Sequence, residues 1–188
     1  MKNPICQMIA LLATIACSVF YSEAQTPSGL VSWWQGENNL LDSAGTNHAS
    51  IYVPPQPVGY VPGRDGQAFS FAGGIVEIPS ATALCPTTNL TVQAWVRGTG
   101  MPAYRYLVCK ALGAGGVSYA IYTGGEAGAL FFVIRAGGAG WVPSGAAAPA
   151  SVWDGNWHQL TATYDGNDSR LYLDGVEVPG GANGPGEI

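Results

Sequence analysis

Carboxylates are the side chains here that could break a glycosidic bond, because an acid and a base or nucleophile about 5 Å apart suffice for hydrolysis. After residue 24 the carboxylates are Glu37, Asp42, Asp65, Glu77, Glu126, Asp154, Asp165, Asp168, Asp174, Glu177 and Glu187. No two of them stand two residues apart within a predicted strand, where they would share a face. Asp165 and Asp174 each precede a glycine, a pairing typical of turns. We therefore expect turn-forming and solvated carboxylates, and a protein that is not an enzyme.

Histidine and serine are the other side chains that could take a proton or attack a carbon. His158 shares one face of a predicted strand with Leu160 and Tyr164. We expect a core or edge histidine with a satisfied ring nitrogen, rather than a general base. Ser32 and Ser118 lack the G-x-S-x-G setting of a nucleophile elbow.

Two cysteines, Cys85 and Cys109, remain after residue 24. They could form one disulfide that closes a loop of about two dozen residues and contributes roughly 3 kcal/mol. The alternative is two separate thiols, with Cys109 as a small buried hydrophobe in the apolar run YLVCK. With only His48 and His158 beside them and no CxxC spacing, they do not make the usual tetrahedral zinc set.

Residues 1–24 predict a secretory signal peptide. Lys2 precedes the apolar run from Ile9 to Phe20, and Ser22-Glu23-Ala24 place small residues at the −3 and −1 positions. The run is too short to span a bilayer, although an N-terminal anchor and acylation of Cys17 are alternatives. We expect a secreted, periplasmic or cell-surface protein, with residues 25–29 as a short linker and no membrane span after signal removal.

Charge and composition narrow the classes of partner and fold. The formal net charge is −5, and the basic residues left after the signal are scattered, which argues against nucleic acid or anionic membrane as a partner. Charged residues make up 10% of the chain, against 11% aromatics and 27 glycines. This balance indicates an extracellular all-β domain with many turns.

Period-two alternation predicts many short strands. The segment from Trp157 to Val178 alternates between two faces and is interrupted by Asp165-Gly166 and Asp174-Gly175, as antiparallel hairpins require. The predicted strands are Leu30–Gln35, Ala49–Val53, Ala68–Phe71, Ile75–Ile78, Leu90–Arg97, Tyr106–Lys110, Ser118–Tyr122, Ala129–Arg135, His158–Tyr164, Arg170–Asp174 and Val176–Val178. Together they predict a two-sheet antiparallel sandwich, with 137–149 as a loop and Trp95 off the main apolar face.

Five pieces of sequence, in order, carry a family resemblance: GLVSWWQGENNLLDSAGTNHAS, PGRDGQAFSFAGGIVEIP, NLTVQAWV, YLVCK and NWHQLTATYDGNDSRLYLDGVEV. Together they resemble the laminin-G-like, concanavalin A-like lectin/glucanase jelly-roll domains of secreted bacterial proteins. The resemblance places the domain at 30–178, followed by a Gly/Pro-rich tail at 179–188. It implies two antiparallel sheets, one of them concave, with loops at the rim.

The chain departs from this family in three places. Members often carry FDG and an acidic residue after the GQAFSF strand, whereas Phe71 is followed here by Ala72-Gly73-Gly74. The change weakens a calcium site at this turn, since hard cations need several oxygen ligands, and calcium stays an open cofactor. Glycan-cleaving members carry an E-x-D-x-E strand, which is missing. The IGxN-like and IDEVRIYN-like closing strands are missing too, so we expect a truncated jelly roll or one completed by another element.

Aromatic side chains are the candidate binding residues, because rings cover the apolar faces of sugars. Trp33 and Trp34 are adjacent in a predicted strand and must point to opposite faces. The candidates are Trp33, Tyr104, Tyr106 and Trp141, and the alternative for each is ordinary packing. We expect a non-catalytic module that binds carbohydrate or a glycoconjugate. The alternative is a structural or adhesion module of a larger exported chain that contacts a surface protein.

Overall fold

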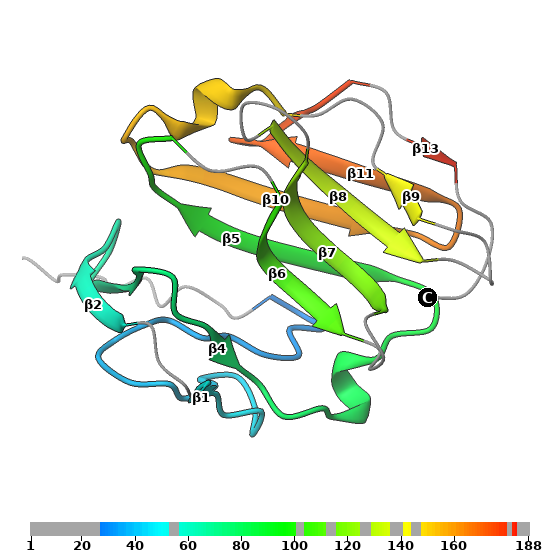
Figure 1. Ribbon diagram of the computed structural model, residues 1–188. Helices are drawn as coiled ribbons and strands as arrows, with labels where there is room; N and C mark the ends of the chain where they lie inside the picture. The colour runs from blue at the N-terminus through cyan, green and yellow to red at the C-terminus, as the bar shows by residue number, and fades with distance from the viewer. Residues whose placement is uncertain are drawn as a thin grey trace, which may run out of the picture. The chain divides into compact units, whose positions relative to one another are not determined.

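The computed structural model describes residues 27–52, 57–100, 104–111, 116–124, 129–135, 141–143, 148–179 and 182–183 (Figure 1). The chain divides into two compact units, Met1–Leu30 and Val31–Ile188. In the first unit the described residues form a turn, in which the Leu30 N–H donates to the Pro27 carbonyl at 3.1 Å. The predicted signal peptide lies outside the described residues.

Two antiparallel sheets dominate the second unit. One has the order β6 (Arg105–Ala111), β7 (Val117–Gly124), β8 (Ala129–Arg135) and β9 (Trp141–Pro143). The other has the order β12 (Val176–Glu177), β11 (Asp168–Leu173), β10 (His158–Tyr164) and β5 (Leu90–Val96), and β13 (Ala182–Asn183) also pairs with β11. The described residues also form two small antiparallel pairs, β1 (Ser50–Ile51) with β4 (Val76–Glu77) and β2 (Val58–Pro62) with β3 (Gln67–Phe71). They include two short 3-10 turns, η1 (Thr82–Leu84) and η3 (Ala150–Trp153).

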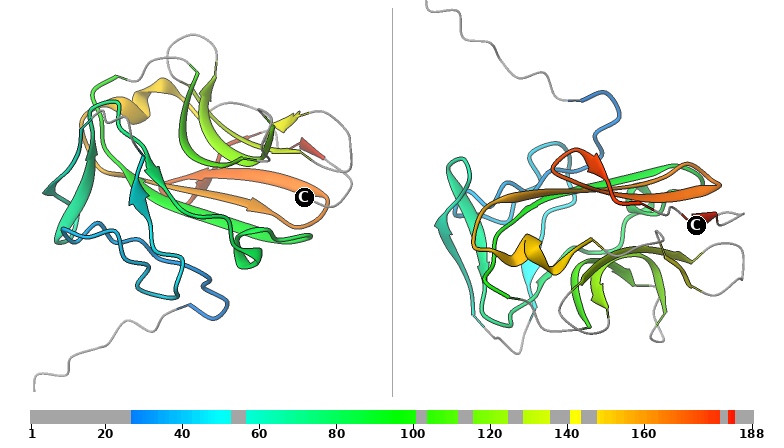
Figure 2. Two further views of the ribbon diagram at one scale, coloured as in Figure 1. Left: turned by 60° about the horizontal axis from the view of Figure 1, so that its bottom comes forward. Right: turned by 90° about the horizontal axis from the view of Figure 1, so that it is seen from above.

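The hydrophobic core lies between the two large sheets, which face each other as layers (Figure 2). From β10, alternate side chains Leu160, Ala162 and Tyr164 point inward and are almost fully buried. They share one cluster with Ile121, Phe132 and Ile134 of the opposite sheet and with Val152 and Trp153 of η3. Burying a side chain of this size contributes roughly 2 kcal/mol. The predicted all-β jelly-roll sandwich is therefore confirmed.

Asp-Gly turns set the register of the hairpins, as the sequence predicts. Asp174 and Gly175 both have positive φ, of 51° and 80°. They close a two-residue turn between Leu173 and Val176, which are paired, and such turns need two left-handed residues. In the loop after Tyr164, the Asp165 carboxylate accepts the N–H groups of Asn167 and Asp168 at 2.9 and 2.8 Å.

Four of the strand predictions differ from the structure. Residues 30–35 form no strand among the described residues, only a bridge from Trp34 to Asp42, because the Asp42 side chain takes the Trp33 N–H at 2.8 Å. The predicted loop 137–149 contains β9, and the predicted tail 179–188 contains β13. Strand β2 was not predicted, since it contains Gly59 and ends at Pro62.

Cys85 and Cys109, for which the sequence allows a disulfide or two separate thiols, are both free and exposed in the structure. Cys85 follows η1, and its Sγ donates to the Ala81 carbonyl at 3.4 Å. Cys109 lies in β6 opposite Ala120. It is exposed rather than buried.

Candidate functional site

A row of aromatic rings crosses the outer face of the sheet that contains β6, β7 and β8. Tyr106, Tyr122 and Phe131 stand opposite one another in the strand register. Their ring centroids are 6.0 Å apart for Tyr106 and Tyr122 and 5.9 Å apart for Tyr122 and Phe131. We call these three residues the aromatic row. Cross-strand aromatic pairs of this kind stabilise a sheet.

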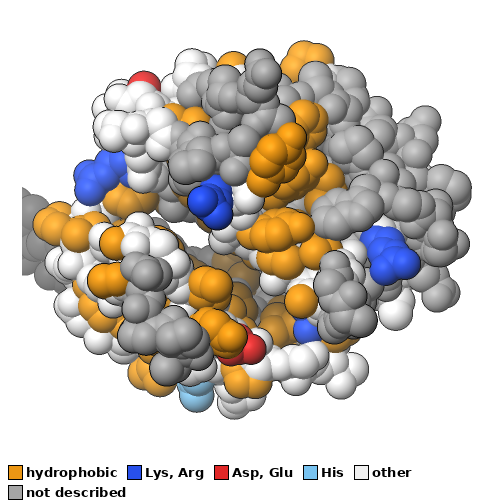
Figure 3. All heavy atoms as spheres, in the orientation of Figure 1, with side chains coloured by type: hydrophobic (Ala, Val, Ile, Leu, Met, Phe, Trp, Pro, Cys, Tyr) orange, Lys and Arg blue, Asp and Glu red, His pale blue; other side chains and the backbone are white. Residues whose placement is uncertain are grey.

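The backbone explains why the aromatic row faces outward. Along β7 and β8, the residues that alternate with Tyr122 and Phe131 are Ile121, Thr123, Leu130 and Phe132, and all four are buried at or near 0% exposure. Tyr122 and Phe131 instead pack against a second, smaller buried cluster of Val117, Ala120 and Val133, which are 7%, 0% and 1% exposed. Hydrophobic side chains gather over these strands in Figure 3. The row therefore runs from this second cluster to the exposed ring of Tyr106.

Tyr106 and Tyr104 are the most accessible rings of this surface. Tyr106 is 53% exposed and Tyr104 is 73% exposed. Burial, followed by Cys109 and Tyr122, raises the pKa of Tyr106, so its hydroxyl stays a hydrogen-bond donor at neutral pH. Tyr104 has a positive φ of 58°, and its N–H donates to the Thr123 carbonyl at 2.6 Å. A bulky residue in this conformation is strained, and such strain is concentrated at functional sites.

The structure brings together only part of the predicted binding set. Tyr104 and Tyr106 lie at the start of β6, beside Tyr122 and Phe131, which were predicted as strand residues without a binding role. Trp141 pairs in β9 with Arg135 of β8. Trp33 is 50% exposed but belongs to the segment that Asp42 organises, and it has no ring contact with the row among the described residues.

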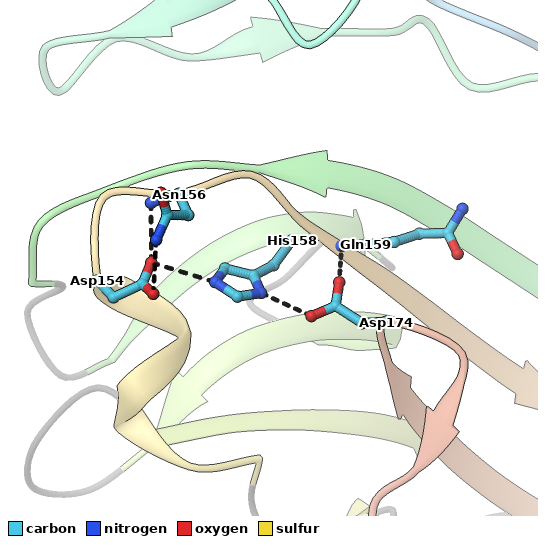
Figure 4. Close-up of polar contacts among 5 residues, drawn as sticks. All are labelled: Asp154, Asn156, His158, Gln159 and Asp174. Atoms are coloured by element: carbon cyan, nitrogen blue, oxygen red, sulfur yellow. Dashed lines mark hydrogen bonds and ion pairs between the residues drawn. The ribbon is translucent and has the colours of Figure 1, made fainter.

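A second cluster joins His158 to two carboxylates (Figure 4). His158 Nδ1 lies 2.7 Å from Asp174 Oδ2, and Nε2 lies 3.2 Å from Asp154 Oδ1. A bridge between Thr99 and Asp154 and a bond from the Gly155 N–H to the Gly98 carbonyl hold Asp154 in place. The imidazole is 18% exposed at the start of β10. Of the two predicted positions, in the core or at an edge, His158 therefore has the edge position.

Electrostatics favour the charged form of every member of this cluster. Hydrogen bonds to Asp174 and then Asp154 raise the pKa of His158. Bonds from the Asn156 N–H and side chain, and then from His158, lower the pKa of Asp154 to about 2. Bonds from His158 and the Gln159 N–H lower the pKa of Asp174. Because both ring nitrogens are occupied, His158 has no free nitrogen with which to accept a proton from a substrate.

No metal centre is found within the described ranges, where no group of three or more His, Cys, Asp or Glu side chains could hold an ion. The turn after β3, at which the family resemblance would place calcium, has Ala72 and Gly73 in place of acidic residues. The described residues also include no helix long and apolar enough to cross a membrane.

The chain belongs to the concanavalin A-like lectin/glucanases superfamily, whose laminin-G-type family model matches residues 71–188. A similar solved structure is domain 4 of AbnA, a GH43 extracellular arabinanase from Geobacillus stearothermophilus, in complex with arabinotriose. The two share 19% identity at a TM-score of 0.62, over 80% of this chain and 73% of that one. At this identity the likeness shows the fold alone. No curated protein matches the chain.

Proposed function

We propose that this chain is a secreted, non-catalytic module that binds carbohydrate through the aromatic row of β6, β7 and β8. The observation that carries the proposal is the alignment of Tyr106, Tyr122 and Phe131 on the sheet face away from the main core, with Tyr106 exposed at one end of the row and Tyr104 exposed two residues before it. Rings of this kind cover the apolar faces of sugars, while phenol hydroxyls bond to sugar hydroxyls. The spacing of about 6 Å between rings gives a ligand more than one platform along the row.

The comparisons support the class of ligand. The superfamily's description includes lectins, and the similar arabinanase domain was solved with arabinotriose. Exposed aromatic side chains commonly mark a binding site when they lie together. Tyr104 and Tyr106 are 73% and 53% exposed, and each adds a polar hydroxyl to its apolar ring.

The arrangement of charged groups supports a non-catalytic role. Asp154 and Asp174, the carboxylates joined through His158, are both engaged with that imidazole and with backbone N–H groups. Low carboxyl pKa values fit fixed anions rather than a general acid, which needs a raised pKa.

The test is calorimetric titration of the folded protein with a panel of oligosaccharides that begins with arabinotriose. Tyr106→Ala should weaken binding of the bound glycan roughly fivefold to tenfold, since one ring platform contributes about 1 kcal/mol. Tyr52→Ala is the matched control, because Tyr52 is also 49% exposed but lies beside β1. If the folded protein binds no glycan in the panel, the proposal is wrong and a protein-binding adhesion module takes its place.

A further inference from the structure

Thr123 is a polar residue on the buried side of β7. Its side chain is 0% exposed, lies opposite Leu130 of β8 in the strand register, and shares the inner face with Ile121. Moving a hydroxyl out of water destabilises a fold unless the hydroxyl is hydrogen-bonded, and a valine would fill nearly the same volume without that cost. The contacts of Thr123 therefore indicate what its hydroxyl contributes.

Thr123 accepts two consecutive backbone N–H groups from the segment that enters β6. Its Oγ1 accepts the Arg105 N–H at 2.9 Å, and its carbonyl accepts the Tyr104 N–H at 2.6 Å. In an extended strand, consecutive N–H groups point to opposite edges, so one residue of a neighbouring strand does not accept both. The two bonds to Thr123 therefore require the backbone to turn at Tyr104.

Tyr104 has the turned backbone that these two bonds require. Its φ is 58°, in the left-handed region that bulky residues rarely adopt. Such a conformation persists only where the surrounding contacts hold it. Thr123 supplies two of these contacts, and the one made by its hydroxyl depends on which side chain stands at this position.

The backbone conformation of Tyr104 determines the direction in which its ring leaves the chain. The ring is 73% exposed, and its Cα lies within about 7 Å of that of Tyr106, which is two residues further on at the exposed end of the aromatic row. A ring on a fixed backbone loses less conformational entropy when a ligand binds than a ring on a mobile segment. Fixing the backbone at this position should therefore raise affinity without adding any contact to the ligand.

We infer that Thr123 is a positioning residue of the glycan site. Its buried hydroxyl holds Tyr104 in the left-handed conformation and so presents the Tyr104 ring as a preformed platform near the exposed end of the aromatic row. Thr123 does not touch the ligand itself, because its side chain is fully buried. The inference rests on the proposed function of the same surface.

The binding experiment compares Thr123→Val, which removes the hydroxyl but keeps the shape, with Thr123→Ser, which keeps the hydroxyl. In calorimetric titration with arabinotriose, or with the panel glycan that binds most tightly, Thr123→Val should lose affinity roughly threefold to tenfold and Thr123→Ser should stay near the wild type. In a Tyr104→Ala background, Thr123→Val should cause no further loss, because it acts through that ring. Thr161→Val is the matched control, since Thr161 Oγ1 accepts the Gln93 side chain at 3.1 Å on the other large sheet, and it should not change affinity.

Amide hydrogen exchange followed by NMR tests the same contact without a ligand. The Arg105 N–H should be protected in the wild type and in Thr123→Ser, and it should exchange much faster in Thr123→Val. Rapid exchange of this N–H in the wild-type protein would overturn the inference, whether or not Thr123→Val folds.

The outcomes separate this inference from the proposed function. Full affinity in Thr123→Val, or the same loss with and without the Tyr104 ring, overturns the inference and leaves glycan binding intact. If the wild type binds no glycan, the proposed function is wrong. The positioning of Tyr104 then stands if the Arg105 N–H is protected only when residue 123 carries a hydroxyl, and it fails otherwise.

Discussion

His158 Nδ1 lies 2.7 Å from Asp174 Oδ2, and this contact joins the first residue of β10 to the turn between β11 and β12. Asp174 also accepts the Gln159 N–H at 2.8 Å, so its carboxylate bonds both to the side chain of β10's first residue and to the backbone of its second. On its other side His158 reaches Asp154, just after η3. One imidazolium therefore connects three segments at the end of the sheet.

The contribution of this cluster to stability should depend on pH. The pKa of His158 is raised above its usual value of 6.5, so its contribution is full below about pH 6.5 and is lost as the pH rises through the folded-state pKa. Asp154 and Asp174 have lowered pKa values, so their contribution to stability is present above about pH 4 and is lost as the pH falls. The cluster should contribute most between these limits, as urea unfolding at a series of pH values would show.

Asp174→Asn tests this pH dependence without disturbing the turn, because Asn readily adopts the positive φ of 51° found at this position. We expect a loss of stability of no more than about 1 kcal/mol at pH 6, since both partners are partly exposed, and a smaller loss at pH 8. Asp165→Asn, at the other Asp-Gly turn, is the control and should not change the pH dependence in this range. An equal loss at both pH values for Asp174→Asn would contradict the argument.

Asp42 organises the segment before β1 as a carboxylate that accepts backbone N–H groups. It is 4% exposed and accepts the N–H groups of Trp33, Ala44, Gly45 and Asn47 at 2.8 to 3.1 Å. Burial alone would raise its pKa, but these hydrogen bonds outweigh burial and lower the pKa to about 2. We expect Asp42→Ala to lower the free energy of unfolding by about 2 kcal/mol in urea titration. The exposed Asp65→Ala should change it by less than about 0.5 kcal/mol, and equal effects would argue against this role.

Local patterns in the sequence predict the strands that carry regular alternation. The bounds of Ala129–Arg135 and His158–Tyr164 agree with β8 and β10, because their inward residues meet a continuous core. Residues 30–35 alternate similarly, yet they form no strand because a side chain nine residues away, Asp42, takes the Trp33 N–H. Competition of this kind depends on a contact distant in sequence, which a local pattern does not contain.

The site was predictable only in part for a similar reason. Tyr104 and Tyr106 stand beside glycine-rich sequence and were predicted as binding residues. Tyr122 and Phe131 alternate with buried residues, which was visible in the sequence, but their alignment with Tyr106 depends on the register of three strands. The cluster around His158 likewise needs the fold, since Asp154 and Asp174 are 20 positions apart in the chain.

The side-chain hydroxyl of Ser169 does not contribute to the stability of the fold. Its side chain is fully buried in β11, and its Oγ has no hydrogen-bond partner among the described residues. Ser169→Ala should raise the free energy of unfolding by about 1 kcal/mol, because it removes a desolvated polar group and leaves little space behind. The urea midpoint should rise at constant slope. Ser43→Ala is the control, since Ser43 Oγ is exposed and donates to Gln35 Oε1 at 2.7 Å, and it should give no gain.

The substitution Gly124→Ala tests whether glycan binding depends on the positions of the rings in the aromatic row. A Cβ at this position would lie 3.0 Å from the Phe131 ring and 3.2 Å from Tyr122 Oη, so Gly124→Ala must displace one of these rings. The change adds no charge and removes no ring, so a loss of affinity would come from the displaced ring. We expect a severalfold loss of glycan affinity, together with altered near-UV circular dichroism. Gly59→Ala in β2 is the matched control, because a Cβ there meets nothing within 4 Å, and its affinity should equal that of the wild type. Unchanged affinity in Gly124→Ala, despite altered aromatic dichroism, would mean that the ligand does not contact the row.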